Sequence, residues 1–230
     1  MIPWLEGDDP FPPVTRALRE PNGLLCAGAD LSPQRLLAAY REGIFPWYSG
    51  REPILWWSPD PRMVLFCDEL RISRSLAKGL RNRGYEIRFD TDFAGVLTGC
   101  AAPRRDGSGT WLGGPMRAAY LRLHRAGRAH SVECWQDGAL VGGLYGVSLG
   151  RMFYGESMFS QATDASKIAL VALVRELQAR GCPLIDCQVR TPLLASMGAR
   201  ELPRAEFLRR LRALVNYAEP IGKWARVQTE

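Results

Sequence analysis

The strongest constraint on the fold is a regular alternation of strand and helix patterns between residues 131 and 189. Apolar residues flank Asp137-Gly138, a dipeptide typical of two-residue hairpins, so strands are expected over 131–136 and 139–147. A third strand is expected over 151–158. Apolar residues then recur at i, i+3, i+4 and i+7 as on a helix face, before a further strand over 184–189. An antiparallel meander, a crossover helix and one more strand predict an α+β fold.

The chain before residue 63 has a different pattern. One helix is expected over 33–42, with Ser32 as N-cap and Gly43 as its stop. Prolines and aromatic residues dominate the stretch up to Arg62, and such prolines interrupt regular structure. We therefore expect a small, irregular N-terminal domain over 1–62 and a larger domain over 63–230. In the larger domain, the patterns also predict strands at 63–67 and 85–90 and helices at 73–83 and 115–125.

What the chain lacks disfavours several classes of protein. It has no apolar run of membrane-spanning length, and its first residues do not form a signal peptide, so we expect a cytoplasmic protein without membrane contacts. The spacings of its six cysteines fit neither a CxxC zinc site nor a compact disulfide framework. With His124 and His130 as the only histidines, a zinc hydrolase is also disfavoured, and we expect no metal.

An excess of positive charge favours a polyanionic partner without proving one. Lysine and arginine total 30 against 24 acidic residues, which gives a net charge of +6. Four of the cations are expected on the helix over 73–83 and are our candidates for contacts with RNA phosphates: Arg74, Lys78, Arg81 and Arg83. Four tryptophans in proline- or glycine-rich segments either stack on unpaired bases or pack those segments by burial: Trp47, Trp56, Trp57 and Trp111.

Two acidic residues interrupt strands that are otherwise apolar. The two-residue period of a strand places Asp186 and Gln188 on one face, and Glu156 lies within the strand over 151–158. A buried carboxylate is costly unless it is paired or used. Asp186 is therefore either an acceptor of hydrogen bonds from a nearby loop or part of a site. For Glu156 the alternative to a site is a salt bridge with Arg151 or Lys167.

One absence separates this chain from an acetyl-CoA-dependent N-acetyltransferase, which the order of elements otherwise suggests. Such enzymes bind the coenzyme A pyrophosphate with glycine-rich backbone at the start of the crossover helix. No glycine occurs between Gly155 and Gly181. An ordinary acetyltransferase is therefore one alternative, and a non-enzymatic RNA-binding protein is another.

Several segments resemble the bacterial leucyl/phenylalanyl-tRNA–protein transferases. The most specific are WWSPDPR at 56–62, GESMFS at 155–160 and IDCQ at 185–188. The matching segments follow in order from about Phe11 to Leu211. The resemblance implies an N-acetyltransferase-like C-terminal domain with a central, mostly antiparallel sheet. It also implies transfer of leucine or phenylalanine, and less well methionine, from aminoacyl-tRNA to proteins beginning with Arg or Lys. The product would enter N-end rule degradation, and the family suggests a monomer.

The resemblance also assigns site residues. Trp47, Trp111 and Tyr120 are expected at the tRNA 3′ end, and Glu156, Asp186 and Gln188 at the reacting groups. The chain departs from the family at Leu193, where a histidine is common, and at Leu173 and Leu177, where larger aromatic residues occur in some members.

The reaction is attack of an α-amine on an ester, which needs positioning more than a cofactor, so we expect none. We interpret Asp186 as an anchor that orients Gln188 and draws the proton from the amine, although a tRNA ribose hydroxyl fits that step equally. Glu156 would bind the cationic acceptor or the amino group of the donor. Seven apolar residues are expected to line the aminoacyl pocket, wholly or as partly lining core: Leu144, Phe153, Met158, Leu170, Leu173, Leu177 and Ile185.

Overall fold

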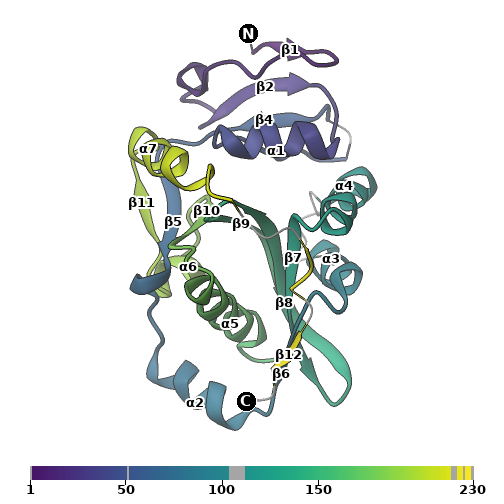
Figure 1. Cartoon of the computed structure of the whole chain (residues 1–230), viewed down its shortest axis with the longest axis vertical. Coiled ribbons are helices and arrows are strands. Elements are labelled where there is room, and N and C mark those ends of the chain that lie inside the picture. The colour runs from purple at the N-terminus through teal and green to yellow at the C-terminus, as the bar shows by residue number, and fades with distance from the viewer. Residues whose placement is uncertain (1, 51, 104–111, 219–221, 225, 229–230) are drawn as a thin grey trace.

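The computed structural model describes residues 2–50, 52–103, 112–218, 222–224 and 226–228, which form two sheets (Figure 1). The smaller sheet has the order β1-β2-β4-β3. Its strands are β1 (Trp4–Leu5), β2 (Leu24–Gly28), β3 (Phe45–Pro46) and β4 (Leu55–Trp57). A small, irregular N-terminal part was expected here; the part is small, and the short strands within it were not predicted. Strands of two to five residues are too short to show a period in the sequence.

Helix α1 (Pro33–Arg41) covers the smaller sheet on the side that faces the rest of the molecule (Figure 1). Its predicted start is confirmed, because the Ser32 hydroxyl accepts the backbone N–H of Arg35 at 3.2 Å. Gly43 follows the helix with φ of +71°, a conformation that glycine adopts without strain.

The larger sheet has the order β11-β5-β10-β9-β8-β7-β6-β12. Its strands are β5 (Arg62–Phe66), β6 (Glu86–Phe89), β7 (Ala129–Gln136), β8 (Ala139–Leu149), β9 (Met152–Ser160), β10 (Leu184–Gln188), β11 (Arg200–Leu202) and β12 (Arg226–Gln228). Among the described strands, only β9 and β10 pair in parallel in this sheet. The predicted α+β fold with a mostly antiparallel central sheet is thus confirmed. The hairpin at Asp137-Gly138 is also confirmed, with φ of +50° and +77°.

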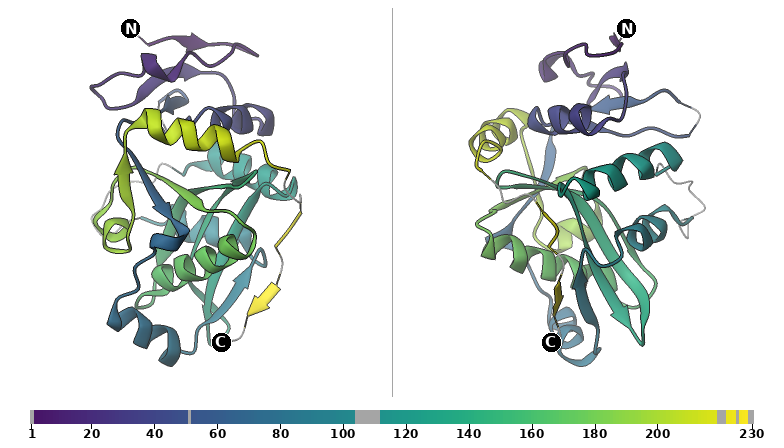
Figure 2. Two further views of the ribbon diagram at one scale, coloured as in Figure 1. Left: turned by 60° about the vertical axis from the view of Figure 1, so that its left-hand side comes forward. Right: turned by 45° about the vertical axis from the view of Figure 1, so that its right-hand side comes forward.

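Helices cover both faces of the larger sheet (Figure 1). The crossover helix α5 (Ala165–Ala179) packs on one face, and α3 (Phe93–Ala101) and α4 (Gly114–Arg125) pack on the other. Helix α2 (Arg74–Asn82) lies at the end of the molecule opposite the smaller sheet. The short α6 (Pro192–Ser196) follows β10, and α7 (Arg204–Leu214) lies beside the smaller sheet (Figure 2). No helix within the described ranges is both long and apolar enough to cross a membrane.

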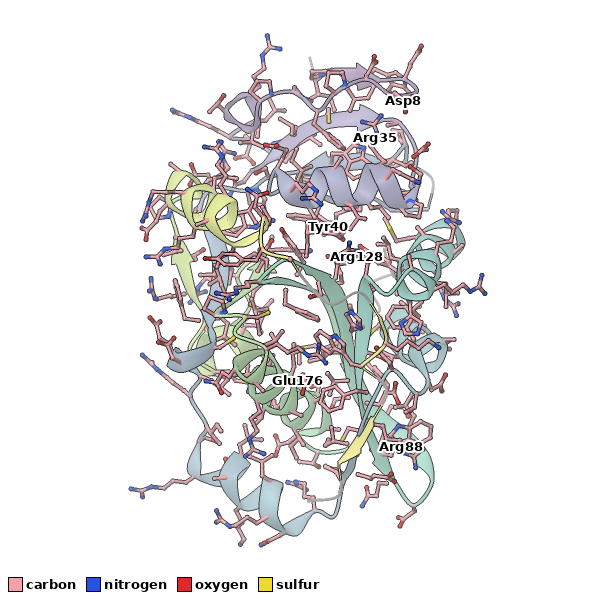
Figure 3. The ribbon with its side chains drawn as sticks, viewed as in Figure 1. Asp8, Arg35, Tyr40, Arg88, Arg128 and Glu176 are labelled. Carbon is pink, nitrogen blue, oxygen red and sulfur yellow. The ribbon has the colours of Figure 1, made fainter. Side chains whose placement is uncertain are left out.

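The chain passes from one sheet to the other between Trp57 and Arg62. A single hydrophobic cluster nevertheless extends across both parts, and it includes Leu36 and Trp56 from the first together with Tyr154 and Phe207 from the second. The Tyr40 side chain of α1 points toward the larger sheet (Figure 3). Because the two parts share one core, the division into independent domains at 62/63 stays a prediction.

Candidate functional site

The candidate site lies where β9 and β10 separate. Their parallel pairing runs from Met152 and Leu184 to Tyr154 and Asp186, where it ends among the residues that the structure describes. Each strand also carries a bulge at this level, one that leaves Glu156 unpaired against β8 and one that leaves Cys187 unpaired against β5. A bulge bends a strand and redirects its side chains. The two bulges bring Glu156 and Gln188 together across the gap, with the Gln188 amide donating to Glu156 Oε1 at 3.0 Å.

Glu156 is the centre of a buried polar cluster. The Tyr40 hydroxyl donates to Oε1 at 2.8 Å and the Tyr120 hydroxyl donates to Oε2 at 2.6 Å. Burial raises the pKa of Glu156 from 4.5 to about 7, against the opposing effect of these hydrogen bonds. The carboxyl group therefore changes its protonation state near neutral pH, and this chemistry suits a group that exchanges a proton.

The tyrosines that hold Glu156 come from different parts of the chain. Tyr40 lies on α1 and Tyr120 on α4, and both rings are fully buried. Burial, and next the nearby Glu156 charge, raise the pKa of both hydroxyl groups well above 10, so they remain protonated donors. Tyr154 donates to the Tyr40 backbone carbonyl at 2.8 Å and thereby ties α1 to β9.

Asp186 lies behind this cluster in a buried ion pair. Its Oδ1 accepts Arg62 Nε at 2.8 Å and its Oδ2 accepts Arg62 Nη2 at 2.7 Å, with both side chains 0% exposed. Oδ1 also accepts the backbone N–H of Gln188 at 2.9 Å. The expectation that Asp186 and Gln188 share one face was wrong, because the bulge and the φ of +63° at Gln188 break the two-residue period. Gln188 lines the cavity described next, whereas Asp186 does not.

A cavity of about 1060 Å³ opens beside Glu156 and Gln188, between the smaller sheet, β8 to β10, α5 and α6. Of the seven residues predicted to line an aminoacyl pocket, five line this cavity: Leu144, Met158, Leu170, Leu173 and Ile185. Phe153 and Leu177 do not line it, because both lie fully buried in the core beneath β9 and α5. Leu193, at the position where the family commonly has histidine, also lines the cavity.

The tryptophans divide into different roles. Trp47 is 46% exposed and lines the cavity, as does Trp57. Trp56 is fully buried, with its indole N–H donating to the Gly28 carbonyl at 3.0 Å, so it packs the smaller sheet. Trp111 lies outside the described residues. Tyr120, predicted at the tRNA 3′ end, is fully buried behind Glu156, and its surroundings favour a role in holding that carboxylate.

The basic residues of the predicted phosphate-binding helix are not equivalent. Arg74, Lys78 and Arg81 are exposed on α2. Arg83 follows the helix and is only partly exposed, with its guanidinium 3.3 Å from the Asp164 carboxylate. Three of the four cations are therefore available to a polyanion.

The start of α5 is unlike a phosphate-binding turn. Asp164 precedes the helix with φ of +62°, and its carboxylate accepts Lys167 at 2.9 Å. The Ser166 N–H donates to the Ser160 hydroxyl at 3.3 Å. A carboxylate at this position would repel a pyrophosphate. The salt bridge considered for Glu156 does not form either, since Lys167 pairs with Asp164 and Arg151 lies over the Tyr217 ring.

Sequence reasoning missed two partners of the site. Arg62 was placed at the end of a loop, and Tyr40 was one residue of a predicted helix. The pattern of a single sequence links neither to residues more than a hundred positions away. One signal in the sequence could have indicated Arg62. A buried Asp186 requires a cationic partner, and few arginines of the chain lie next to an apolar strand segment.

Comparison with known proteins identifies the family. Residues 64–212 match the family model described as leucyl/phenylalanyl-tRNA protein transferase, and residues 29–60 match the model of its N-terminal domain. The chain belongs to the leucyl/phenylalanyl-tRNA–protein transferase family. The family prediction and the prediction of an aminoacyltransferase are thus confirmed.

Curated relatives match nearly the whole chain. The protein of Nitrosospira multiformis is 62% identical over 97% of this chain and 97% of its own. The proteins of an Azoarcus species and of Chromobacterium violaceum are each 60% identical, over 98% and 97% of this chain and 96% of their own. All three carry the family's name. Among solved structures, L-PGS from Bacillus licheniformis is 14% identical with a TM-score of 0.37, covering 73% of this chain and 54% of that one.

Proposed function

We propose that this enzyme transfers leucine or phenylalanine, and less well methionine, from aminoacyl-tRNA to the N-terminal amine of proteins that begin with Arg or Lys. The modified protein then becomes a substrate of N-end rule degradation. The observation that carries the site assignment is the Glu156–Gln188 pair at the head of an apolar cavity. Family membership supplies the donor and the class of acceptor.

The reaction forms one bond and breaks one. The amine nitrogen attacks the ester carbonyl carbon, and the bond from that carbon to the ribose oxygen breaks. The amine nitrogen loses one proton in the reaction, and the ribose oxygen gains one. An α-amine with a pKa of about 7.7–8.0 is partly neutral at physiological pH, so positioning supplies most of the acceleration. A general base adds about 10²–10⁴-fold.

Glu156 is the carboxylate placed for that proton. It lines the cavity, and its pKa of about 7 lets it accept a proton from the amine and return it. Gln188 lies beside it and is suited to bind the attacking amine or the ester carbonyl. Asp186 acts on Gln188 through the backbone N–H and is a positioning residue. A shuttle through a ribose hydroxyl remains the alternative route for the proton.

The apolar side chain of the donor amino acid fits the lining of the cavity. Leu144, Leu170 and Leu173, with Met158 and Ile185, offer aliphatic surface and no hydrogen-bonding side chain to the leucyl or phenylalanyl group. Trp47 at the mouth stacks on the terminal adenine, and we assign the same end of tRNA to Trp111. Phosphates farther along the tRNA are bound by Arg74, Lys78 and Arg81 on α2. We propose that the enzyme acts as a cytoplasmic monomer.

Single-turnover transfer of labelled leucine from tRNA to an Arg-initiated peptide tests the proposal. Transfer to that peptide, with none to an otherwise identical peptide whose α-amine is acetylated, is the expected result. An ordinary acetyltransferase would use acetyl-CoA instead, and an RNA-binding protein would retain tRNA without transferring leucine. Either outcome would refute the proposed function.

A further inference from the structure

The charges around the cavity indicate what kind of ligand it accepts. Within the described lining, the ionisable acids are Glu52 and Glu156, and no lysine, arginine or histidine lines it. The two carboxylates come from different sheets. Glu156 lies on β9 in the larger sheet and is buried, and Glu52 lies between β3 and β4 of the smaller sheet and is exposed. A cavity with acids and no described cation favours a cationic ligand.

Glu156 is poorly suited to select a cationic side chain. Both of its oxygens already accept hydrogen bonds, from Tyr40 and Gln188 at Oε1 and from Tyr120 at Oε2. Glu156 as a residue is 9% exposed, and at neutral pH a substantial fraction of its carboxyl group is protonated, since the pKa is about 7. Its position and chemistry fit the reacting amine, so the side chain of the acceptor must find its counter-charge elsewhere.

Glu52 has the opposite properties. Its Oε2 accepts the Ser49 backbone N–H at 2.7 Å and the Ser49 hydroxyl at 2.6 Å. These bonds hold the pKa of Glu52 below its usual value, so the carboxylate is charged throughout the neutral range. They also fix its orientation. Among the described residues, Oε1 has no hydrogen-bond partner, which leaves one oxygen for a ligand.

Aromatic residues close to Glu52 in sequence line the same cavity. Tyr48 and Trp57 line the cavity with Glu52. The Trp57 indole N–H donates to the Trp47 carbonyl at 2.6 Å, and the two indoles meet edge to face with centroids 5.5 Å apart, so the wall is held in place. A guanidinium group combines a charge-assisted hydrogen bond to a carboxylate with stacking on an aromatic face.

We propose that Glu52 selects the acceptor by binding its cationic N-terminal side chain, with the neighbouring aromatic wall stacking on the guanidinium or the alkyl stem. The inference rests on the proposed function for the identity of the acceptor. It separates two tasks within one cavity: Glu156 serves the amine that reacts, and Glu52 reads the side chain next to that amine.

The test uses two peptides that differ only in the charge of their first residue, one beginning with arginine and the other with its neutral isostere citrulline. In the unaltered enzyme, kcat/KM for leucine transfer is expected to favour arginine about tenfold or more. Glu52→Gln should reduce that ratio by roughly five- to tenfold, through a higher KM for the Arg peptide. Transfer to the citrulline peptide and KM for leucyl-tRNA should not change. Glu42→Gln is the matched control, because Glu42 is exposed at the end of α1 and does not line the cavity.

A ratio that stays at the unaltered value in Glu52→Gln overturns the assignment, and so does an equal loss with both peptides, which would place Glu52 on the donor. Binding of the Arg peptide without tRNA, measured by calorimetry, separates this inference from the proposed function. If binding depends on Glu52 but no leucine is transferred, the inference stands and the proposed function fails. If leucine is transferred but binding of the Arg peptide does not depend on Glu52, the proposed function stands and this inference fails.

Discussion

Replacement of Asp186 by alanine should reveal a residue that is structural and functional at once. Asp186 and Arg62 are both 0% exposed, and two hydrogen bonds of 2.8 and 2.7 Å join them. The guanidinium lies 4.7 Å from the Phe45 ring and 4.8 Å from the Phe207 ring, with one further bond of 3.1 Å to the Gly43 carbonyl. Asp186→Ala would leave this cation buried among apolar groups without a counter-charge.

The expected cost is about 3–5 kcal/mol of unfolding free energy, the range for breaking one half of a buried ion pair. That is a large part of the roughly 5–15 kcal/mol that stabilises a typical protein. Arg62→Met combined with Asp186→Ala removes both charges, and the double variant should be more stable than the sum of the single changes predicts, by about 2 kcal/mol or more. Urea unfolding of all four proteins, followed by tryptophan fluorescence, measures the cycle.

The functional part of this prediction concerns Gln188. Asp186→Ala also removes the acceptor of the Gln188 backbone N–H, so leucine transfer should fall at least tenfold while tRNA affinity stays nearly unchanged under conditions where the variant is folded. Additive free energies in the cycle would refute the ion-pair reasoning. A parallel loss of transfer and tRNA binding would reduce Asp186 to a purely structural role.

Three further predictions concern other parts of the site. Because burial raises the pKa of Glu156 to about 7, the single-turnover rate should rise with pH through that value. Glu156→Gln should remove this part of the rise and leave only the rise through about 7.7–8.0 that comes from deprotonation of the α-amine. The same raised pKa means that Glu156 contributes to folding stability at low pH and that this contribution is lost as pH rises through about 7, so Glu156→Gln should flatten the pH dependence of the unfolding free energy measured with urea. Gly155 lines the cavity, and a Cβ added there would meet only Asp186 O at 3.6 Å and Ile185 Cγ2 at 3.7 Å. Gly155→Ala should therefore change the melting temperature by no more than a few degrees while it lowers kcat/KM for leucine transfer. Unchanged kinetics would show that no ligand approaches this part of the backbone. Neutralising Arg74, Lys78 and Arg81 should reduce the magnitude of the slope of log tRNA affinity against log salt concentration by about 2. Arg83→Gln should change this slope much less, because Arg83 is partly buried and paired with Asp164. An unchanged slope in the triple variant would instead assign the phosphate contacts to four other arginines: Arg117, Arg122, Arg125 and Arg128.

Most of the larger sheet and its crossover helix could be predicted, because these elements have signals in short stretches of the sequence. The Asp137-Gly138 turn and the apolar face of α5 each depend on residues close together in sequence, and both occur in the structure. Helix α3 was not predicted, since its segment is short and almost uniformly apolar, without the period that distinguishes a helix face.

The arrangement of the site could be predicted only in part. Glu156, Asp186 and Gln188 stood out as polar residues in apolar strands, which is a local signal. Their relation to one another depends on two bulges, and a bulge changes the face of a side chain through pairing with another strand. The partners Tyr40 and Arg62 come from other elements and follow only from the fold.

The Tyr40–Glu156 hydrogen bond has a consequence for protein engineering and for the evolution of this family. A hydroxyl from the smaller-sheet region lowers the pKa of a carboxylate in the larger sheet, against the larger effect of burial. Tyr154 of the larger sheet in turn donates a hydrogen bond to the Tyr40 carbonyl. The first sixty residues are thus not an interchangeable module. A chimera that joins the N-terminal segment of one relative to the remainder of another would inherit a working pH range only if the two halves meet with this geometry. Substitutions along α1 should therefore be accepted in step with changes around β9.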